Sequence, residues 1–273
     1  YKPKISKDFM ALKLNATREA YREFYGRNVE QMPKLVADGR VPMNVAQLMQ
    51  RRLDVRNSDA DIKSSYLDNY FYTGDAVVYH SDGRVKIVLD SQTLREINLQ
   101  SQLSAGALVL ADGVYETLQG KEFTRKESEK HVGNSLTREQ VKSNPIWRDL
   151  ARDTGLLADY TDCIFAEAKQ RFNYDKNMGV YLSDKQKVPT IRAWCVRRLV
   201  YRSDADGRYD LDRGDGRLVG IAPEALSAPG KGASNVRAYS IADLQSFDST
   251  MKGLEAIVRP ELLEPFAQLR KKL

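Results

Sequence analysis

Apolar residues recur at three- and four-residue steps in several stretches of the chain, and this spacing predicts amphipathic helices. The first stretch covers residues 6–25 and ends at Gly26, a residue that commonly follows the last turn of a helix. A second stretch runs from about residue 44 to residue 56, where Pro42 and Asn44 supply a typical start signal. Both stretches are therefore predicted to be helical.

The middle of the chain carries the most regular helical pattern. Thr137 and Gln140 have the spacing of a capping box, and the Asn-Pro pair at 144–145 is typical of a helix N-terminus. Apolar residues then recur on one face over residues 147–172. A further amphipathic pattern over residues 240–258 predicts a helix near the end of the sequence.

Two regions change to the short β-branched runs expected of strands. Residues 75–80 and 84–90 flank a Ser-Asp-Gly sequence, whose glycine tolerates the positive φ of a tight hairpin turn. Residues 199–202, 208–211 and 217–221 form a second set of runs, separated by acidic turns that contain glycine. Each region is predicted to form antiparallel hairpins.

Two segments are ambiguous. Residues 190–198 fit a helix through Ile191, Trp194 and Cys195, whereas a strand would place arginine on both faces, so a helix is favoured. Residues 121–134 are charged, flanked by glycine and without a hydrophobic period. This second segment is interpreted as a linker.

These elements predict an α+β fold with helices at both ends and in the middle and two separate antiparallel β-hairpin regions. The linker would divide the 273 residues into two parts. Residues 1–120 would hold a helical segment and the first β region, and residues 137–273 the long helix, the second β region and the C-terminal helices. The alternative is one compact domain.

Composition narrows the class of protein. Hydrophobic residues make up 42% of the chain and charged residues 29%, which is typical of a globular protein. The apolar run 106–111 is far shorter than the roughly 20 residues that cross a bilayer. Two cysteines are too few for a disulfide framework or a four-thiolate zinc site. We expect a soluble, cytoplasmic protein with no membrane partner and no leading signal segment.

Charge points weakly to nucleic acid as a ligand. The chain has 43 Lys and Arg against 37 Asp and Glu, a net charge of +6, and a solvated basic surface is the simpler interpretation of so small a surplus. Arginine near exposed aromatic rings is nevertheless how single strands are bound, by phosphate pairing and base stacking. The candidate nucleic-acid contacts are Arg51, Arg52, Arg56, Arg192, Arg197 and Arg198.

The densest group of carboxylates suggests a second hypothesis. With Gly207 as the sixth residue of a calcium loop, two aspartates fall at ligand positions three and five and a third at nine. Arg202 and Arg213 stand where the first and last ligands belong, so polar hairpin turns are the favoured interpretation. The candidate ligands of Mg²⁺ or Ca²⁺ are Asp204, Asp206 and Asp210.

Three functional hypotheses remain open at this point. The first is a non-catalytic binding protein with nucleic acid as the favoured ligand. The second is a metal-dependent hydrolase, such as a nuclease, that uses the aspartates of residues 204–215. The third is a structural or assembly protein whose tyrosine-rich segment, residues 66–72, supports an oligomer interface. The sequence selects neither a substrate nor an oligomeric state.

Overall fold

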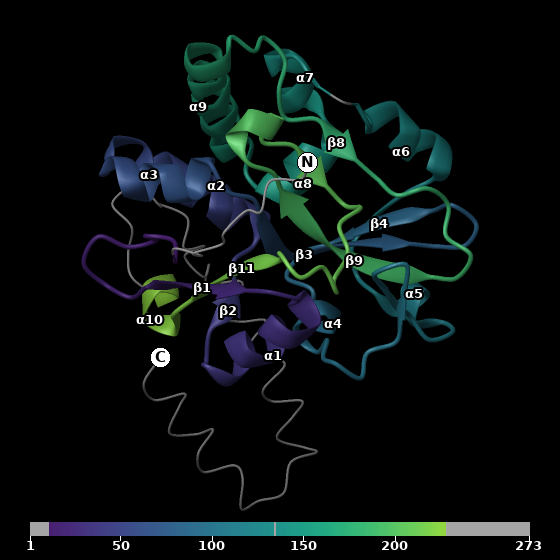
Figure 1. Cartoon of the computed structure of the whole chain (residues 1–273). Helices are drawn as coiled ribbons and strands as arrows, with labels where there is room; N and C mark the ends of the chain where they lie inside the picture. Colours follow the sequence, from purple (N-terminus) through teal and green to yellow (C-terminus); the bar gives the residue numbers. More distant parts are fainter. Residues whose placement is uncertain (1–10, 134, 228–273) are drawn as a thin grey trace, which may run out of the picture. The chain divides into compact units, whose positions relative to one another are not determined.

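Strands from both halves of the sequence meet in one mixed sheet (Figure 1). The computed structural model describes residues 11–133 and 135–227. The chain divides into two units, Tyr1–Ser227 and Ala228–Leu273. The helix predicted for residues 240–258 belongs to the second unit and lies outside the described residues.

The sheet of the first unit has 11 strands in the described part of the chain. Most neighbours are antiparallel, but β11 runs parallel to β3 and β10 parallel to β8. The main path is β1 (Tyr21–Tyr25), β11 (Arg217–Ile221), β3 (Phe71–Tyr79), β9 (Thr190–Val196), β10 (Ala205–Asp206) and β8 (Val180–Tyr181). Off this path lie β2 (Val41–Pro42) on β11, β4 (Val85–Val88) on β3, β7 (Lys121–Phe123) on β4, β6 (Ala107–Val109) on β9 and β5 (Leu103–Ser104) on β6.

Helices cover both faces of this sheet (Figure 1). One core lies under α2 (Val45–Asp54), α3 (Ala60–Leu67), α7 (Arg138–Ser143), α8 (Pro145–Ala151) and α9 (Thr154–Phe172). The other lies under α1 (Asn28–Ala37), α4 (Gln92–Arg95) and α5 (Val114–Thr117). The remaining helices are η1 (Val55–Asn57), α6 (Arg125–His131), η2 (Leu199–Tyr201) and α10 (Pro223–Ser227). The α+β class expected from the sequence is confirmed.

The central strands alternate between the two cores, as the pleat of a strand requires. In β9, Trp194 and Val196 face the first core, whereas Ala193 and Cys195 face the second. Because both faces are buried, β9 lacks the apolar and polar alternation of a half-exposed strand.

The helix predicted for residues 190–198 is therefore wrong. The arginine that argued against a strand, Arg192, is only 4% exposed. Its guanidinium donates to a carboxylate oxygen of Asp210 at 2.6 Å and to the Tyr209 carbonyl at 3.1 Å. It also donates to the carbonyl of Ala105. These distant partners let a charged side chain lie within a buried strand.

Three other local predictions are wrong. Residues 21–25 form β1 and not the end of a helix, because they pair with residues 217–221 along their whole length. Residues 199–201 form the 3₁₀ helix η2 and not a strand, and residues 208–211 are irregular. The predicted linker at 121–134 contains β7 and α6.

Predictions that rest on local turn and cap chemistry are confirmed. Asn44 and Thr137 each form a complete capping box, and Asn144 caps α8 with Pro145 at its start. The hairpin predicted around residues 81–83 joins β3 to β4 in antiparallel register. Strands before residue 120 pair directly with strands after residue 137, through β3 and β9. No helix in the described part is both long and apolar enough to cross a bilayer.

Candidate functional site

The connection between β9 and β11, residues 197–216, is held to the first core by one buried arginine. The Arg52 side chain is 1% exposed, and none of its hydrogen-bond acceptors is a carboxylate. Burial of a charge is costly unless hydrogen bonds replace its water, and here five do so. The acceptors are the carbonyls of Tyr66 (3.0 Å), Asn69 (3.1 Å) and Arg197 (3.2 Å) and the hydroxyls of Tyr160 (2.8 Å) and Ser203 (2.7 Å).

The anchored turn contains strained backbone. Arg202 and Ser203 have φ of 62° and 56°, and Met178 beside them has φ of 52°. Such values cost a residue with a Cβ about 1–3 kcal/mol, so surrounding contacts must enforce them. The Met178 amide donates to the Arg202 carbonyl at 2.8 Å, and a carboxylate oxygen of Asp204 accepts the Gly179 amide at 2.7 Å. These hydrogen bonds hold the backbone of residues 202–204, in the first half of the connection, in one conformation.

Arginine side chains lie over tyrosine rings along this connection. Two guanidinium groups, those of Arg197 and Arg198, lie 4.6 and 4.5 Å from the centroid of the Tyr201 ring. Such cation–π contacts orient both partners at modest energetic gain. Further pairs are Arg202 over Tyr174 at 4.6 Å, Arg208 over Tyr181 at 4.2 Å and Arg213 over Tyr209 at 5.4 Å.

A tyrosine cluster supports the far end of the connection. The Tyr209 ring stacks on Tyr70 at 6.1 Å and meets Tyr72 edge-on at 5.8 Å. Both supporting hydroxyls donate to the connection, Tyr70 to the carbonyl of Asp215 and Tyr72 to that of Asp210 at 3.1 Å. Burial raises the pKa of Tyr70 and Tyr72 well above the ordinary value, so both remain proton donors.

These side chains form one surface, which we call the Tyr–Arg surface. Arg208 joins two of the pairs, because its guanidinium lies over the Tyr181 ring and Tyr209 follows it directly in the chain. Burial raises the pKa of both Tyr181 and Tyr209, and the charge of Arg197 opposes that rise. The arginines of this surface lie on the connection, which contains η2 and β10 and is held at its ends by β9 and β11. The members of the surface are Tyr70, Tyr174, Tyr181, Arg197, Arg198, Tyr201, Arg202, Arg208, Tyr209 and Arg213.

The three candidate metal ligands each have their own partner. Asp206 pairs with Arg208 at 2.9 Å, Asp210 pairs with Arg192, and Asp204 accepts the Gly179 amide. Burial raises the pKa of Asp204 to about 7. Among the described residues, no three His, Cys, Asp or Glu side chains are placed to hold a metal ion. The structure therefore does not bring Asp204, Asp206 and Asp210 together.

The six candidate nucleic-acid contacts are not gathered into one cationic surface. Arg52 and Arg192 are buried among protein acceptors, and the Arg51 guanidinium packs over the rings of Tyr21 and Tyr66. Arg56 is exposed beside a separate groove of about 880 Å³ between α2, η1 and α9. The two that lie on the Tyr–Arg surface are Arg197 and Arg198.

Several members of the Tyr–Arg surface were not predicted from the sequence as parts of a binding site: Tyr174, Tyr181, Tyr209 and Arg213. The segment around residue 209 was interpreted through its aspartates, as hairpin turns or a metal loop. Its Arg-Tyr pair at 208–209 resembles the Tyr-Arg pair at 201–202, and that repetition was the available signal. The platform residue Tyr70 is far away in sequence, so only the fold brings it to Tyr209.

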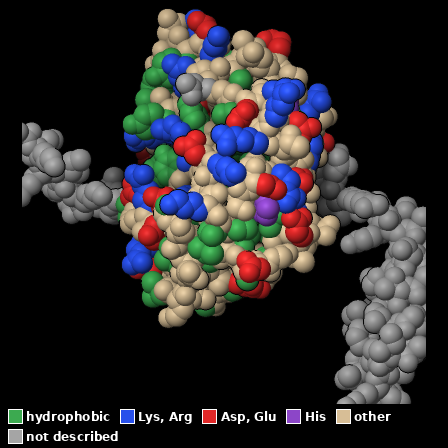
Figure 2. Space-filling model, turned by 90° about the vertical axis from the view of Figure 1, so that its right-hand side faces the viewer, with side chains coloured by type: hydrophobic (Ala, Val, Ile, Leu, Met, Phe, Trp, Pro, Cys, Tyr) green, Lys and Arg blue, Asp and Glu red, His purple; other side chains and the backbone are tan. Residues whose placement is uncertain are grey.

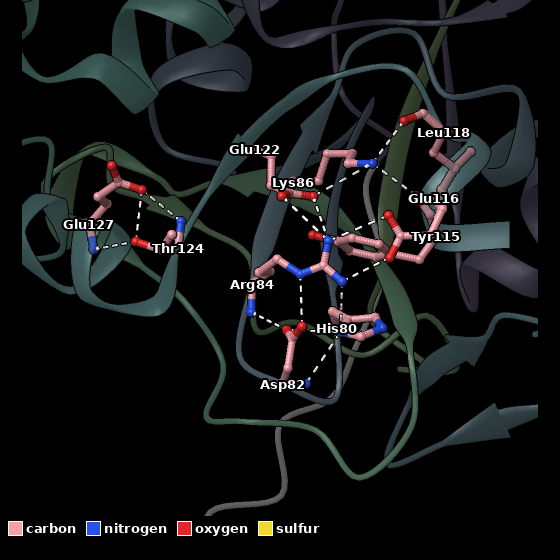
Figure 3. A network of polar contacts seen from close by, with 10 residues as sticks. All are labelled: His80, Asp82, Arg84, Lys86, Tyr115, Glu116, Leu118, Glu122, Thr124 and Glu127. Atoms are coloured by element: carbon pink, nitrogen blue, oxygen red, sulfur yellow. Dashed lines mark hydrogen bonds and ion pairs between the residues drawn. The ribbon is translucent and has the colours of Figure 1, made fainter. Parts of the chain in front are cut away.

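A second polar network lies at the β3–β4 turn (Figure 3). The Arg84 guanidinium is bound by three carboxylates, those of Asp82 and Glu116 at 2.8 Å and of Glu122 at 3.3 Å. The His80 ring packs against Tyr115 in a tilted arrangement, with the ring centroids 4.7 Å apart, and His80 pairs with Asp82 at 2.8 Å. These contacts come from the turn, α5 and β7, so the network clamps three elements together.

This network predicts a dependence of stability on acid. Arg84 lowers the pKa of Asp82 and Glu116 below their ordinary values through hydrogen bonds. The stabilisation is therefore present above the ordinary carboxyl pKa and is lost as the pH falls through the lowered values. We expect Arg84→Gln to lower the melting temperature at pH 7 and to weaken its decline between pH 5 and 2. Calorimetry over that range checks this, and a decline as steep as in the parent chain would contradict it.

The network borders a cavity of about 270 Å³ between the turn, α6 and residues 182–186. Its polar side chains include His80, Arg125, Glu129 and Lys185, which carry both signs of charge. Figure 2 shows the same mixture over the face on the α6 side, where Lys and Arg are interspersed with Asp and Glu. This face has no large area of a single charge for a polyanion.

Comparison with known proteins shows that this chain is similar in fold to a solved structure. No family model matches the sequence, and no curated protein matches it. One solved structure, described as "Accommodation of massive sequence variation in Nanoarchaeota by the C-type lectin fold", aligns with 76% of this chain and 100% of its own. The TM-score is 0.56 and the sequence identity 16%. The first unit has a fold similar to the C-type lectin fold. At this identity the likeness concerns the backbone arrangement alone.

Proposed function

We propose that this chain is a non-catalytic binding protein that recognises another protein through the Tyr–Arg surface. The observation that carries the proposal is the set of arginine–tyrosine pairs on the irregular connection between two buried strands. Tyrosine and arginine dominate the energetics of protein interfaces, because they combine large apolar area with hydrogen bonding. Recognition loops built on a rigid sheet use the same residues.

The similar structure is consistent with a fold whose side chains can vary while its sheet is kept, and we propose that residues 197–216 determine which partner this chain binds. That protein is described as a C-type lectin fold that accommodates massive sequence variation. Strand pairing uses backbone groups, so loops on a sheet can change their side chains while the sheet persists. In this chain, β9 and β11 are such a support, and residues 197–216 are the connection that they hold.

Nucleic acid remains a second candidate ligand, favoured by one observation. Arg197 and Arg198 converge on the exposed Tyr201 ring, which is 47% exposed. Phosphate pairing beside an exposed ring is the arrangement that binds single strands. Under this alternative, affinity for oligonucleotides falls steeply as salt rises.

The proposal is tested with a surface variant that combines Tyr201→Ala, Arg208→Ala and Arg213→Ala. These three side chains are exposed members of the Tyr–Arg surface, so their loss should weaken binding by about 100-fold or more, since each interface anchor of this kind contributes about 1–2 kcal/mol or more. Candidate partners are found by cross-linking to the immobilised chain, and each is then purified for a dissociation constant by calorimetry.

A matched control carries Arg125→Ala, Lys126→Ala and Lys130→Ala on α6, away from the connection. We expect purified partners to bind this control as they bind the parent chain. Partners that bind the surface variant and the parent chain equally would overturn the proposal. A ligand set that consists of nucleic acid, with binding abolished at high salt, would favour the second candidate instead.

A further inference from the structure

Two of the three arginines at one end of the Tyr–Arg surface lack the acidic partners that most exposed arginines of the described residues have, and the third has only a long ion pair. Arg197, Arg198 and Arg202 follow β9 around η2, and we call this end the η2 corner. Within the described residues, neither Arg198 nor Arg202 forms an ion pair with a carboxylate. At the other end of the surface, Arg208 pairs with Asp206 and Arg213 with Asp215.

Asp204 is the carboxylate that forms an ion pair with an arginine of the corner in the described part of the chain, and it is buried. Asp204 is 2% exposed, and its nearer approach to Arg197 is 3.9 Å, longer than a direct hydrogen bond. One oxygen of Asp204 is already used by the Gly179 amide. The corner therefore presents more positive than negative charge to solvent.

Apolar surface accompanies this charge. Val200 and Tyr201 of η2 are 38% and 47% exposed, and they are among the most exposed large hydrophobic residues of the described part. Arg198 hydrogen-bonds to the Tyr201 hydroxyl and lowers the pKa of that phenol. The Arg198 guanidinium, which has no carboxylate partner among the described residues, lies beside this exposed ring and is a suitable contact for an anionic group of a partner.

We propose that the η2 corner binds a carboxylate-rich segment of the partner protein, with an apolar side chain of that segment against Val200 and Tyr201. This inference rests on the proposed function and adds the chemistry of the partner. Guanidinium and carboxylate groups match in geometry, because two parallel N–H groups of the guanidinium can donate to the two oxygens of the carboxylate. Complementary charge also speeds the encounter of the two proteins.

The charges along the connection favour a protein segment over a nucleic acid. Asp210 and Asp212 are exposed further along the same connection, and Asp215 lies half-buried next to Arg213. A nucleic acid that extends from the corner along the connection would bring its phosphates close to these carboxylates, and the like charges would repel. A protein segment can instead place a basic side chain beside them. Single-strand sites need a cationic groove that spans at least four nucleotides.

The test uses an N-acetylated, C-amidated peptide of four glutamates and one phenylalanine, titrated into the full chain at low and high salt. We expect saturable binding, with nuclear magnetic resonance shifts centred on Arg198 and Tyr201. Arg198→Glu reverses one half-buried charge at the corner and should weaken binding by about tenfold. Arg125→Glu changes the net charge equally on α6 and should leave the affinity unchanged.

Several outcomes would overturn the inference. Equal affinity of the Arg198→Glu and Arg125→Glu variants would show that only net charge matters. Equal binding of a peptide with lysine in place of glutamate would show that charge is not recognised. Binding of a ten-residue thymidine oligonucleotide without binding of the glutamate peptide would assign the corner to nucleic acid. A purified partner that needs the Tyr–Arg surface but tolerates Arg198→Glu would refute this inference and leave the proposed function standing.

Discussion

Replacing Arg52 with alanine should lower the free energy of unfolding by about 3–5 kcal/mol. The change removes a buried guanidinium that satisfies five acceptors, and it leaves the hydroxyls of Tyr160 and Ser203 and three carbonyls without that donor. It also empties a volume that water cannot fill without loss of packing. Urea unfolding followed by circular dichroism measures the change.

Two matched substitutions make this prediction specific. Arg56→Ala, on the exposed turn that follows the same helix, should change stability by no more than about 0.5 kcal/mol. Arg52→Lys keeps the charge but not the planar fork, so it should be intermediate. If Arg52→Ala unfolds at the same urea concentration as Arg56→Ala, the anchoring role described for Arg52 is wrong.

Asp204→Asn should stabilise the protein at high pH and have little effect near pH 4. Burial outweighs the attraction of Arg197 and Arg202 and raises the pKa of this carboxyl from 3.8 to about 7. Between those two values the folded state holds a proton that the unfolded state releases, so stability falls as the pH rises. Ionisation of Asp204 therefore lowers the free energy of unfolding by at most about 4 kcal/mol once the pH exceeds 7. The neutral side-chain amide of the Asp204→Asn variant does not ionise, and its oxygen can still accept the Gly179 amide.

The measurement is the free energy of unfolding of both proteins at half-unit steps between pH 4 and 8.5. The difference in favour of Asp204→Asn should grow through the range from 4 to 7 and then stay constant. Asp212→Asn, at an exposed position of the same connection, serves as the control and should show no such growth. A difference that is constant with pH would mean that Asp204 is ionised in the folded protein throughout.

Elements governed by short-range chemistry could be predicted from the sequence. Asn44, Thr137 and Asn144 cap the helices that follow them because a side-chain oxygen meets an amide two or three residues on. The hairpin at residues 81–83 depends on an equally local turn. These caps and this turn are determined by residues only a few positions apart, so the sequence alone is enough to predict them.

Elements governed by distant partners could not be predicted in this way. Residues 21–25 carry a helical spacing but become β1 because residues 217–221 offer a complete set of strand hydrogen bonds. Residues 190–196 form a central strand because Ala105, Tyr209 and Asp210 satisfy the guanidinium of Arg192. Tertiary context overrides local preference at both places.

The candidate site shows the same division. Arg197 and Arg198 were predicted from the sequence as nucleic-acid contacts, and Tyr201, the ring that they contact, lies within five residues of both. The sequence does not distinguish these half-buried arginines from Arg52, which has the same chemistry but is fully enclosed by α3, α9 and the 197–216 connection. Burial decides which arginines can meet a ligand, and burial is a property of the fold.

The pairing of β1 with β11 has a consequence for how quickly this unit can form. Tyr21 lies opposite Ile221, so almost the whole described chain must be synthesised before these two strands can meet. Contacts of such large sequence separation raise the contact order, which slows folding because chain entropy is lost before the contact is gained. Refolding of this unit should therefore be limited by closure of its first strand against its last, and truncation before residue 217 should leave β11, and with it that closure, unformed.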